Sequence, residues 1–171
     1  MKPIILIGMM GSGKTTIGLQ LSQQLNCPVI DTDTLVEQTT NQTITELFQT
    51  VGEASFRQLE HVALKTALET DGIISTGGGI ITTPQNQTLL AKGYVIYLKT
   101  DLDVLCKRLD PTHRPLLHHE TLPIKLQQLL DEREQLYEQA ADLILDTSSH
   151  SCVEVSTLIL NHLAVISTSL N

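Results

Sequence analysis

The chain has 171 residues, of which 41% are hydrophobic and 18% are charged, and its formal net charge is −8. This length and composition predict one globular domain with a substantial core. The broad acidity argues against nucleic acid or an anionic membrane surface as a partner, because both repel negative charge.

The sequence also lacks the usual marks of export. No apolar run approaches the length of a membrane-spanning helix, and the first predicted strand begins too early to leave space for a signal peptide. The cysteines at positions 27, 106 and 152 are far apart and show no paired spacing, which is typical of reduced thiols. We therefore expect a cytoplasmic protein.

Short β-branched strands alternate with longer helical patterns along the chain. The predicted strands cover residues 4–7, 28–30, 73–75, 94–98 and 143–145. The predicted helical segments cover residues 14–25, 34–70, 85–91, 102–109, 122–137 and 152–163. Apolar strands separated by helices indicate an α/β fold with a parallel sheet covered on both faces, whose ligands bind beyond the carboxyl ends of the strands. Residues 110–120 contain two prolines and little periodicity, which predicts a loop of the kind that serves as a lid.

The first predicted strand runs directly into the sequence GMMGSGKT at residues 8–15, which fits the phosphate-binding pattern G-x-x-x-x-G-K-T. Its glycines permit backbone conformations in which successive N–H groups converge on phosphate oxygens. Lys14 supplies a point charge to the β- and γ-phosphates, and the Thr15 hydroxyl is suited to Mg²⁺. A helix that starts near Lys14 adds the positive end of its dipole. A glycine turn without function is the alternative, but the strand before the motif and the amphipathic segment after it favour nucleotide binding.

Two carboxylates follow the second predicted strand, in the sequence Asp31-Thr32-Asp33. Residues two apart in an extended backbone project to the same side, so both carboxylates can face the phosphate site. One could hold Mg²⁺ through its waters and the other could meet a substrate hydroxyl. The alternative, equally weighted, is that Asp33 or Thr32 only caps the next helix.

Three consecutive glycines, residues 77–79, follow the third predicted strand. Consecutive glycines are entropically costly, which favours a floor where the backbone approaches a ligand closely. A loose connector is the alternative.

The chain has four arginines: Arg57, Arg108, Arg114 and Arg133. Arginine binds carboxylate or phosphate with a planar fork, so we expect most of the four to line one pocket. Each also has an ordinary alternative. Arg57 has helical spacing to two glutamates for surface ion pairs, Arg133 lies in an acidic run typical of a solvated face, and Arg108 could be exposed. Arg114 lies in the predicted lid, where an arginine can neutralise charge on a transferred phosphoryl group.

Taken together, the order and spacing of six motifs resemble the shikimate kinase family. The motifs are GMMGSGKTTIG, DTD, FRQLE, STGGG, RPLL and ER-x-x-x-Y-x-x-x-AD, and they run over nearly the whole chain. The resemblance implies a nucleoside-monophosphate-kinase-like fold with a five-stranded parallel sheet flanked by helices. It implies one domain over residues 1–171, with a substrate-binding subdomain at about 32–62 and a lid at about 109–123. It also implies transfer of the γ-phosphoryl group of ATP to the 3-hydroxyl of shikimate, a step of chorismate and aromatic amino acid biosynthesis.

The resemblance also implies roles for individual residues. ATP would be bound by Gly11, Ser12, Gly13, Lys14, Thr15, Thr16, Arg108 and Arg114. Mg²⁺ would be bound directly by Thr15 and through water by Asp31. Shikimate would be bound by Asp33, Arg57, Gly78, Gly79 and Arg133. The catalytic residues would be Lys14, Asp33 as proton acceptor, and Arg114 as the lid arginine. Arg108 is the candidate for the arginine that stacks on adenine.

Other functions share some of these motifs. Gluconate kinases and nucleoside monophosphate kinases share the phosphate-binding loop, but the DTD segment with Arg57 and Arg133 favours a small polyol carboxylate. A guanine-nucleotide switch normally carries an N-K-x-D motif, which this sequence lacks. A nucleotide sensor would bind ATP without turnover. Size and family suggest a monomer.

Overall fold

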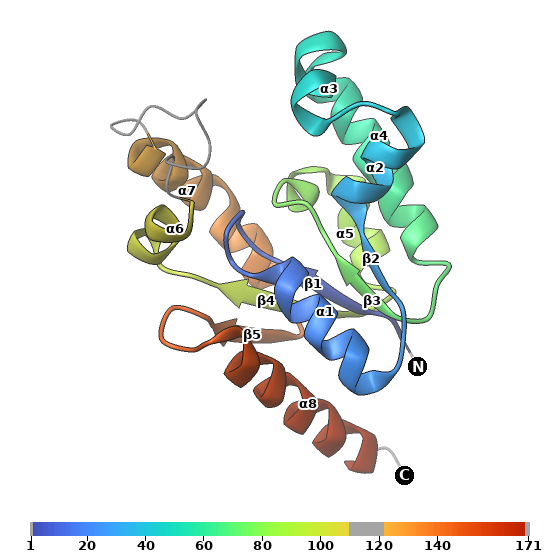
Figure 1. Ribbon diagram of the computed structural model, residues 1–171, viewed down its shortest axis with the longest axis vertical. Coiled ribbons are helices and arrows are strands. Elements are labelled where there is room, and N and C mark those ends of the chain that lie inside the picture. The colour runs from blue at the N-terminus through green and yellow to red at the C-terminus, as the bar shows by residue number, and fades with distance from the viewer. Residues whose placement is uncertain (1, 110–121, 170–171) are drawn as a thin grey trace.

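The computed structural model describes residues 2–109 and 122–169. Within these residues the chain forms a five-stranded parallel sheet in the order β2-β3-β1-β4-β5 (Figure 1). The strands are β1 (Ile4–Ile7), β2 (Val29–Asp31), β3 (Ile73–Ser75), β4 (Tyr94–Lys99) and β5 (Leu143–Asp146). The predicted fold class and number of strands are therefore confirmed.

Helices follow each strand. They are α1 (Lys14–Leu25), α2 (Thr32–Thr40), α3 (Ile44–Thr50), α4 (Gly52–Ala67), the 3₁₀ helix η1 (Ile80–Thr82), α5 (Pro84–Leu90), α6 (Leu102–Arg108), α7 (Leu122–Ala140) and α8 (Cys152–Ser169). The helical segment predicted over residues 34–70 is thus three helices rather than one. Asn41 ends α2 in a left-handed conformation, Thr43 and Glu46 form a capping box that starts α3, and Gly52 has a φ of 78° where α4 begins.

Two hydrophobic cores lie on opposite faces of the sheet because successive strand residues point to opposite sides. In β1, Ile5 and Ile7 pack with residues of α4, α5 and α7, whereas Ile4 and Leu6 pack with residues of α1 and α8. A third, smaller cluster joins α2, α3 and α4 and consists of Val36, Leu47, Phe56 and Ala63. These three helices therefore have a small core of their own.

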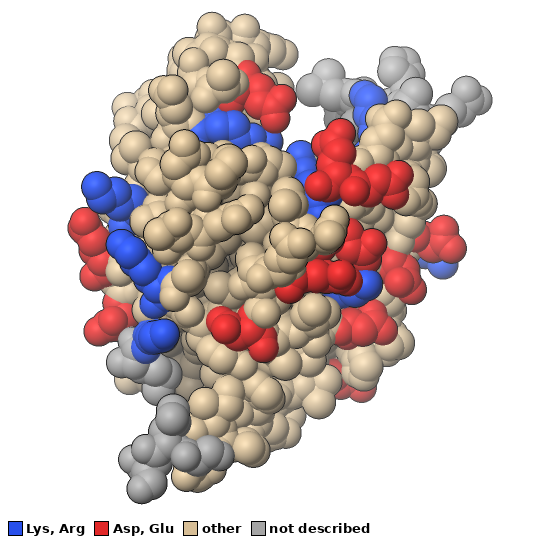
Figure 2. All heavy atoms as spheres, turned by 180° about the vertical axis from the view of Figure 1, so that it is seen from behind, with Lys and Arg blue, Asp and Glu red and all other residues tan. Residues whose placement is uncertain are grey.

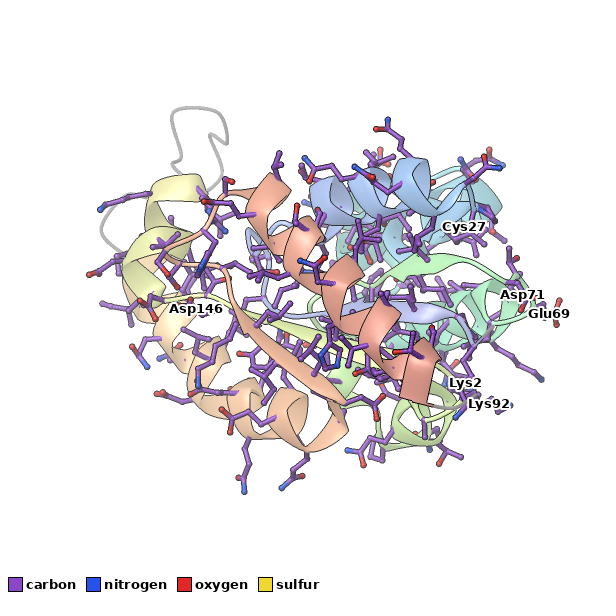
Figure 3. The ribbon with its side chains drawn as sticks, turned by 90° about the horizontal axis from the view of Figure 1, so that it is seen from below. Lys2, Cys27, Glu69, Asp71, Lys92 and Asp146 are labelled. Carbon is purple, nitrogen blue, oxygen red and sulfur yellow. The ribbon has the colours of Figure 1, made fainter. Side chains whose placement is uncertain are left out.

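Acidic side chains crowd one side of the surface, where α7 lies (Figure 2). The view from below shows the direction of the strands. Asp146 ends β5 at one edge of the sheet, whereas Lys2, Asp71 and Lys92 precede strands at the other edge (Figure 3). All carboxyl ends of the strands therefore meet at one edge. Among the described residues, no helix is long and apolar enough to cross a membrane.

Candidate active site

The turn between β1 and α1, residues 8–15, has the backbone of a phosphate-binding loop. Its three glycines adopt positive φ angles of 145° at Gly8, 81° at Gly11 and 95° at Gly13. Residues with side chains rarely adopt these angles, so this turn depends on glycine. α1 begins at Lys14, as expected, and carries no acidic residue in its first turn. The positive end of its dipole thus faces the edge of the sheet where an anion would bind.

Lys14 folds back over this loop. Its Nζ donates hydrogen bonds to the carbonyl oxygens of Gly8 and Met9, both at 2.8 Å. The residue is only 8% exposed. Burial lowers the pKa of its ammonium group to about 8, although the nearby carboxylates of Asp33 and Asp31 oppose this change. A phosphate group beside the ammonium would favour its charged form.

The remaining loop residues divide between the interior and the cleft. Ser12 is 1% exposed, and its hydroxyl lies 3.5 Å from Lys14 Nζ. Gly11, Gly13, Thr15 and Thr16 line the cleft above the loop. The Ser12 backbone N–H donates a hydrogen bond to the Met9 carbonyl oxygen at 3.2 Å, so Ser12 stabilises the turn from inside.

Asp31 ends β2 beside the phosphate loop, and its two carboxylate oxygens have different tasks. Oδ1 accepts hydrogen bonds from the backbone N–H groups of Asp33 at 3.1 Å and Thr34 at 3.2 Å, which caps α2. Oδ2 accepts hydrogen bonds from the hydroxyls of Thr15 at 3.1 Å and Ser75 at 3.0 Å. The cap fixes the carboxylate so that one oxygen stays next to Thr15. Hydroxyl and carboxylate oxygens at this spacing are suitable ligands for Mg²⁺.

The predicted extended arrangement of residues 31 and 33 is wrong. β2 ends at Asp31 and α2 begins at Thr32, so Asp33 reaches the site from the first turn of a helix. The capping alternative also named the wrong residues, since Asp31 is the cap. The Thr32 hydroxyl instead accepts a hydrogen bond from the Gly77 N–H at 3.0 Å. Both carboxylates nevertheless line the same cleft.

Asp33 carries an unpaired oxygen. Its Oδ1 is buried and has no hydrogen-bond partner among the described residues. Burial raises the pKa of this carboxyl group, and the charge of Asp31 raises it further, whereas Lys14 and Arg57 oppose the rise. A buried carboxylate with a free oxygen and a raised pKa is suited to accept a hydrogen bond, and then a proton, from a hydroxyl group.

Two of the three glycines after β3, Gly77 and Gly79, are required by close packing. A Cβ atom on Gly77 would overlap Asp33 Oδ1 and lie 2.7 Å from Glu60 Oε1. A Cβ atom on Gly79 would overlap the guanidinium group of Arg57. The backbone of this glycine loop, residues 77–79, therefore lies directly against the charged groups of the site, and it is not a loose connector.

Arg57 forms the two ion pairs that its helical spacing predicted, but one of them is buried. Its guanidinium nitrogens lie 2.8 Å from Glu60 and 3.0 Å from Glu53. The Glu60 side chain is 1% exposed and that of Arg57 is 16% exposed, so this is not a surface pair. Burial raises the pKa of Glu60, and the attraction of Arg57 opposes this rise. Arg57 Nε is buried without a partner among the described residues.

Arg133 is also buried, although its neighbours in the sequence are acidic. It is 7% exposed, and its Nε has no hydrogen-bond partner within the described part of the chain. Its charge lowers the pKa of Glu60, as that of Arg57 does. Two arginines thus converge on one buried glutamate, and the interpretation of Arg133 as part of a solvated face is wrong.

Arg108 lies at the other end of the cleft and bridges two loops. Its guanidinium donates hydrogen bonds to the carbonyl oxygens of Gly11 at 3.2 Å and Thr147 at 2.9 Å. The residue is exposed, as the alternative allowed, but its head group is held. Arg108 therefore joins the phosphate loop to the segment that follows β5.

An open cleft of about 660 Å³ connects these groups. It is lined by Met10, Gly11, Gly13, Lys14, Thr15, Thr16, Asp31, Asp33, Thr76, Gly78, Arg108, His150, Ser151 and Cys152. Of the three arginines among the described residues, Arg108 lines this cleft. The expectation that most of the four arginines line one pocket is therefore wrong. Arg57 and Arg133 instead adjoin the cleft through Glu60 and Asp33, and Arg114 lies outside the described residues.

Comparisons with known proteins agree on one family. The family model described as shikimate kinase matches residues 10–164. The shikimate kinase of Prochlorococcus marinus is 38% identical over 166 residues, which cover 95% of this chain and 83% of that protein. The shikimate kinase of Rippkaea orientalis is 45% identical over 139 residues, which cover 80% and 74%. The chain belongs to the shikimate kinase family.

Solved structures agree with this assignment. The shikimate kinase from Acinetobacter baumannii in complex with shikimate superposes with a TM-score of 0.90 at 33% identity, covering 100% of this chain and 96% of that one. A gluconokinase from Sinorhizobium meliloti reaches a TM-score of 0.61 at 15% identity, which shows a shared fold alone. As a shikimate kinase family member, the chain is an ATP-dependent kinase of shikimate in aromatic biosynthesis.

Sequence reasoning about this shikimate kinase family member missed three side chains that shape the site. Glu60 follows Phe56 and precedes Leu64 at helical spacing, so a carboxylate on the apolar stripe of α4 was its signal. Ser75 ends an apolar strand just before the glycine loop and supports Asp31. Tyr137 follows Arg133 by one helical turn, which placed its hydroxyl near the site.

Proposed function

We propose that the chain transfers the γ-phosphoryl group of MgATP to the 3-hydroxyl of shikimate, which gives ADP and shikimate 3-phosphate. The observation that carries this proposal is a set of three buried polar atoms that have no hydrogen-bond partner within the described part of the chain: Asp33 Oδ1, Arg57 Nε and Arg133 Nε. Buried polar groups are nearly always paired, so these atoms indicate a missing ligand. One acceptor and two cationic donors fit a hydroxylated acid.

On the phosphate side, we assign ATP to the loop and to the first turn of α1. The phosphates would be surrounded by the turn formed by Gly11, Ser12 and Gly13 and by the N–H groups of Lys14, Thr15 and Thr16. The side chain of Lys14 would neutralise their charge. The pKa of about 8 leaves Lys14 mostly protonated at neutral pH, and the phosphates would raise this pKa further. Arg108 would contact the base side of ATP, near residues 146–151.

Mg²⁺ fits the pair formed by Thr15 and Asp31. The Thr15 hydroxyl and Asp31 Oδ2 are 3.1 Å apart beside the phosphate loop, and both are oxygen ligands of the kind that Mg²⁺ prefers. Thr15 would bind the ion directly and Asp31 would hold it through water. A bound Mg²⁺ would neutralise phosphate charge during transfer.

On the acceptor side, Arg57 and Arg133 would bind the carboxylate of shikimate. Their Nε atoms are unpaired, and the buried Glu60 between them fixes the Arg57 guanidinium. The N–H groups of Gly78 and Gly79 would bind the substrate from the glycine loop. Two fixed arginines also explain how an acidic protein with a net charge of −8 can bind an anion.

Asp33 would orient the 3-hydroxyl and accept its proton. As the substrate oxygen bonds to the γ-phosphorus, the bond from that phosphorus to the bridging oxygen of ADP breaks, and the hydroxyl proton passes to Asp33 Oδ1. The raised pKa of Asp33 makes this carboxylate a stronger base. Positioning and charge neutralisation supply the remaining acceleration.

Three further assignments complete the proposal. Residues at about 32–62 would form the substrate-binding subdomain. Residues at about 109–123, of which 110–121 lie outside the described residues, would form the lid, exclude water and bring Arg114 onto the phosphates. The protein would be a cytoplasmic monomer that acts on a small molecule, and its net charge of −8 supports the absence of nucleic acid or anionic membrane partners.

The test is ADP release on addition of shikimate with MgATP, compared with gluconate and CMP as acceptors. We expect turnover with shikimate and its loss in Asp33→Asn. Asp71→Asn is the matched control, because Asp71 is an exposed aspartate at the opposite edge of the sheet. Preferred turnover with gluconate or CMP would contradict the proposed acceptor. Binding of ATP without turnover on any acceptor would indicate a nucleotide sensor.

A further inference from the structure

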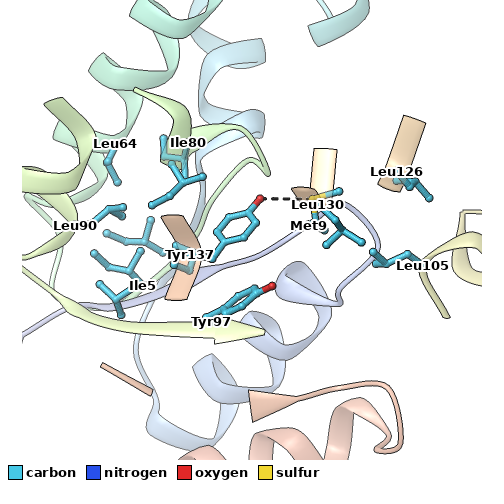
Figure 4. Close-up of a cluster of buried hydrophobic side chains, with 14 of the residues drawn as sticks. Ile5, Met9, Leu64, Ile80, Leu90, Tyr97, Leu105, Leu126, Leu130 and Tyr137 are labelled. Carbon is cyan, nitrogen blue, oxygen red and sulfur yellow. Dashed lines mark hydrogen bonds between the residues drawn. The ribbon is translucent and has the colours of Figure 1, made fainter. Parts of the chain in front are cut away.

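Tyr137 is a fully buried polar side chain next to the glycine loop. It lies on α7, is 0% exposed, and its ring stacks on that of Tyr97 with 4.9 Å between the ring centroids. Its hydroxyl is directed toward the phosphate loop, where the Met9 sulfur lies 3.8 Å away (Figure 4). The ring is therefore fixed by packing, and its hydroxyl has a fixed position.

This hydroxyl donates a hydrogen bond to the Gly78 carbonyl oxygen. The carbonyl of Gly78 and the N–H of Gly79 belong to one planar trans peptide, so they point in opposite directions. A hydroxyl that holds the carbonyl on one side therefore directs the N–H of Gly79 to the other side. Glycine has no side chain to restrain this peptide, which leaves the hydrogen bond as a main determinant of its orientation.

The same side chain lies next to the carboxylate-binding part of the site. Arg133 precedes Tyr137 by one turn of α7, so the two side chains are neighbours on the same face of this helix. Burial raises the pKa of Tyr137 above its usual range, while Arg133 opposes the rise. The phenol thus stays protonated and remains a donor to Gly78 throughout the neutral and mildly alkaline range.

The glycine loop is also confined on its other sides. A Cβ atom on Gly78 would lie 3.3 Å from the backbone nitrogen of Met10, and one on Gly79 would overlap the Arg57 guanidinium. The Gly78–Gly79 peptide is thus enclosed between the phosphate loop, Arg57 and Tyr137. Even a small rotation of the peptide in this space would misdirect the N–H of Gly79.

We propose that Tyr137 is a positioning residue for the acceptor: its hydroxyl fixes the Gly78–Gly79 peptide so that the Gly79 N–H meets shikimate. This inference rests on the proposed function, because it assigns shikimate to the site. It differs from a purely structural role, in which the hydroxyl would only satisfy a buried carbonyl.

The test compares Tyr137→Phe with Tyr97→Phe. Both variants remove one hydroxyl from the same buried ring stack, but only the first removes the hydrogen bond to Gly78. We expect Tyr137→Phe to raise both the Kd and the KM for shikimate by about tenfold, the loss expected for one hydrogen bond. The Kd is measured by calorimetry without ATP. The KM for ATP should stay within about twofold of wild type, since the phosphate loop is unchanged. Tyr97→Phe should leave both constants within the same limit.

Unchanged shikimate binding in Tyr137→Phe, with only a lower Tm, would overturn the inference and leave a structural role. Arg57→Lys serves as the positive control for the site. If Arg57→Lys weakens shikimate binding and Tyr137→Phe does not, the proposed function stands and this inference fails. If the wild type does not bind shikimate, both fail.

A second measurement does not depend on a folded variant. In a crystal structure of the wild-type chain with shikimate, we expect the Gly78 carbonyl to accept a hydrogen bond from the Tyr137 hydroxyl. The Gly79 N–H should donate a hydrogen bond to the substrate. A Gly78 carbonyl turned away from Tyr137 in that complex would overturn the inference.

Discussion

The phosphate loop and the acceptor site are built in different ways. The phosphate loop is a continuous segment, residues 8–15, in which backbone carbonyls pair with Lys14 and glycine angles set the path. The proposed acceptor site is assembled from α2, α4, the glycine loop and α7. Among residues 2–109 and 122–169, its atoms Asp33 Oδ1, Arg57 Nε and Arg133 Nε have no hydrogen-bond partner.

This difference shows which half depends on its ligand. The phosphate loop satisfies its lysine internally, so it is complete before ATP binds. The acceptor site holds two buried arginines around one buried glutamate, and an unpaired buried polar group is costly. A bound acid would relieve that cost, so substrate binding and local stability should be coupled in the acceptor site.

The largest expected effect is that of the lid arginine. Arg114→Ala should lower kcat by about a thousandfold, because an arginine on the transferred phosphoryl group acts mainly in the transition state. Shikimate binding should change by less than about threefold. Steady-state kinetics measure kcat, and calorimetry measures the affinity for shikimate.

Arg108→Ala is the comparison for Arg114→Ala. Arg108 contacts the Gly11 and Thr147 carbonyls, so its loss should raise the KM for ATP more than it lowers kcat. Equal losses of kcat and shikimate binding in Arg114→Ala would contradict the role of Arg114.

Asp33→Asn should lower kcat by about a hundredfold or more, because an amide cannot accept the proton. ATP binding should persist, because no residue of the phosphate loop is hydrogen-bonded to the Asp33 carboxylate. Single-turnover experiments with MgATP and shikimate measure the chemical step. A variant with more than about a third of the wild-type rate would show that Asp33 is not the base.

Arg57 has a structural and a binding role that can be separated. Arg57→Met should lower the free energy of unfolding by about 3 kcal/mol, because it leaves the Glu60 carboxylate buried without its partner. The double variant Arg57→Met/Glu60→Leu should regain most of that stability but keep a shikimate KM raised by about tenfold or more. Denaturant titration and kinetics on the same preparations report the two effects.

Recovery of shikimate binding in the double variant would mean that Arg57 supports the fold without touching the substrate. Failure of the double variant to regain stability would instead contradict the buried Arg57–Glu60 pair.

A smaller effect concerns pH and Lys14. Its pKa of about 8 in the free protein should rise when phosphates bind, so ATP binding near pH 8 should take up about half a proton. Above that pH the free lysine is neutral, and ATP affinity should fall as pH rises. Below about pH 7 the lysine is already charged, and this dependence should vanish. Calorimetry in buffers of different ionisation enthalpy measures the proton uptake, and proton release at pH 8 would contradict the burial of Lys14.

The smallest effect is expected away from both sites. Lys99 lies between Glu134 and Glu138, and all three side chains are about 40% exposed. Exposed ion pairs contribute little, so Lys99→Met should change the free energy of unfolding by less than about 1 kcal/mol and leave activity unchanged. A larger loss, measured by urea unfolding, would show that charge pairs on the outside of α7 support the acceptor site.

The sequence predicted the phosphate loop well because its determinants are local. The glycine angles, the start of α1 at Lys14 and the pairing of Thr15 with Asp31 all depend on a few neighbouring residues and one strand end. The parallel sheet followed from the alternation of strands and helices. These features need no knowledge of packing.

The acceptor site was harder to predict because distant elements build it. Arg133 has acidic neighbours in the sequence, and only the packing of α7 shows that it is buried. Asp33 was placed on an extended strand because the start of α2 at Thr32 gives no clear signal before the Asp31 cap is seen. Glu60 required the recognition of a carboxylate on an apolar helix stripe, and its partners come from other elements.

The central claim is that the unpaired atoms of the acceptor site bind one acid beside the phosphate loop. A crystal structure of the chain with shikimate tests it most directly. We expect the carboxylate within about 2.7–3.2 Å of the Nε atoms of Arg57 and Arg133, with a ring hydroxyl at a similar distance from Asp33 Oδ1. An ordered shikimate bound elsewhere, with these three atoms still unpaired, would contradict the account.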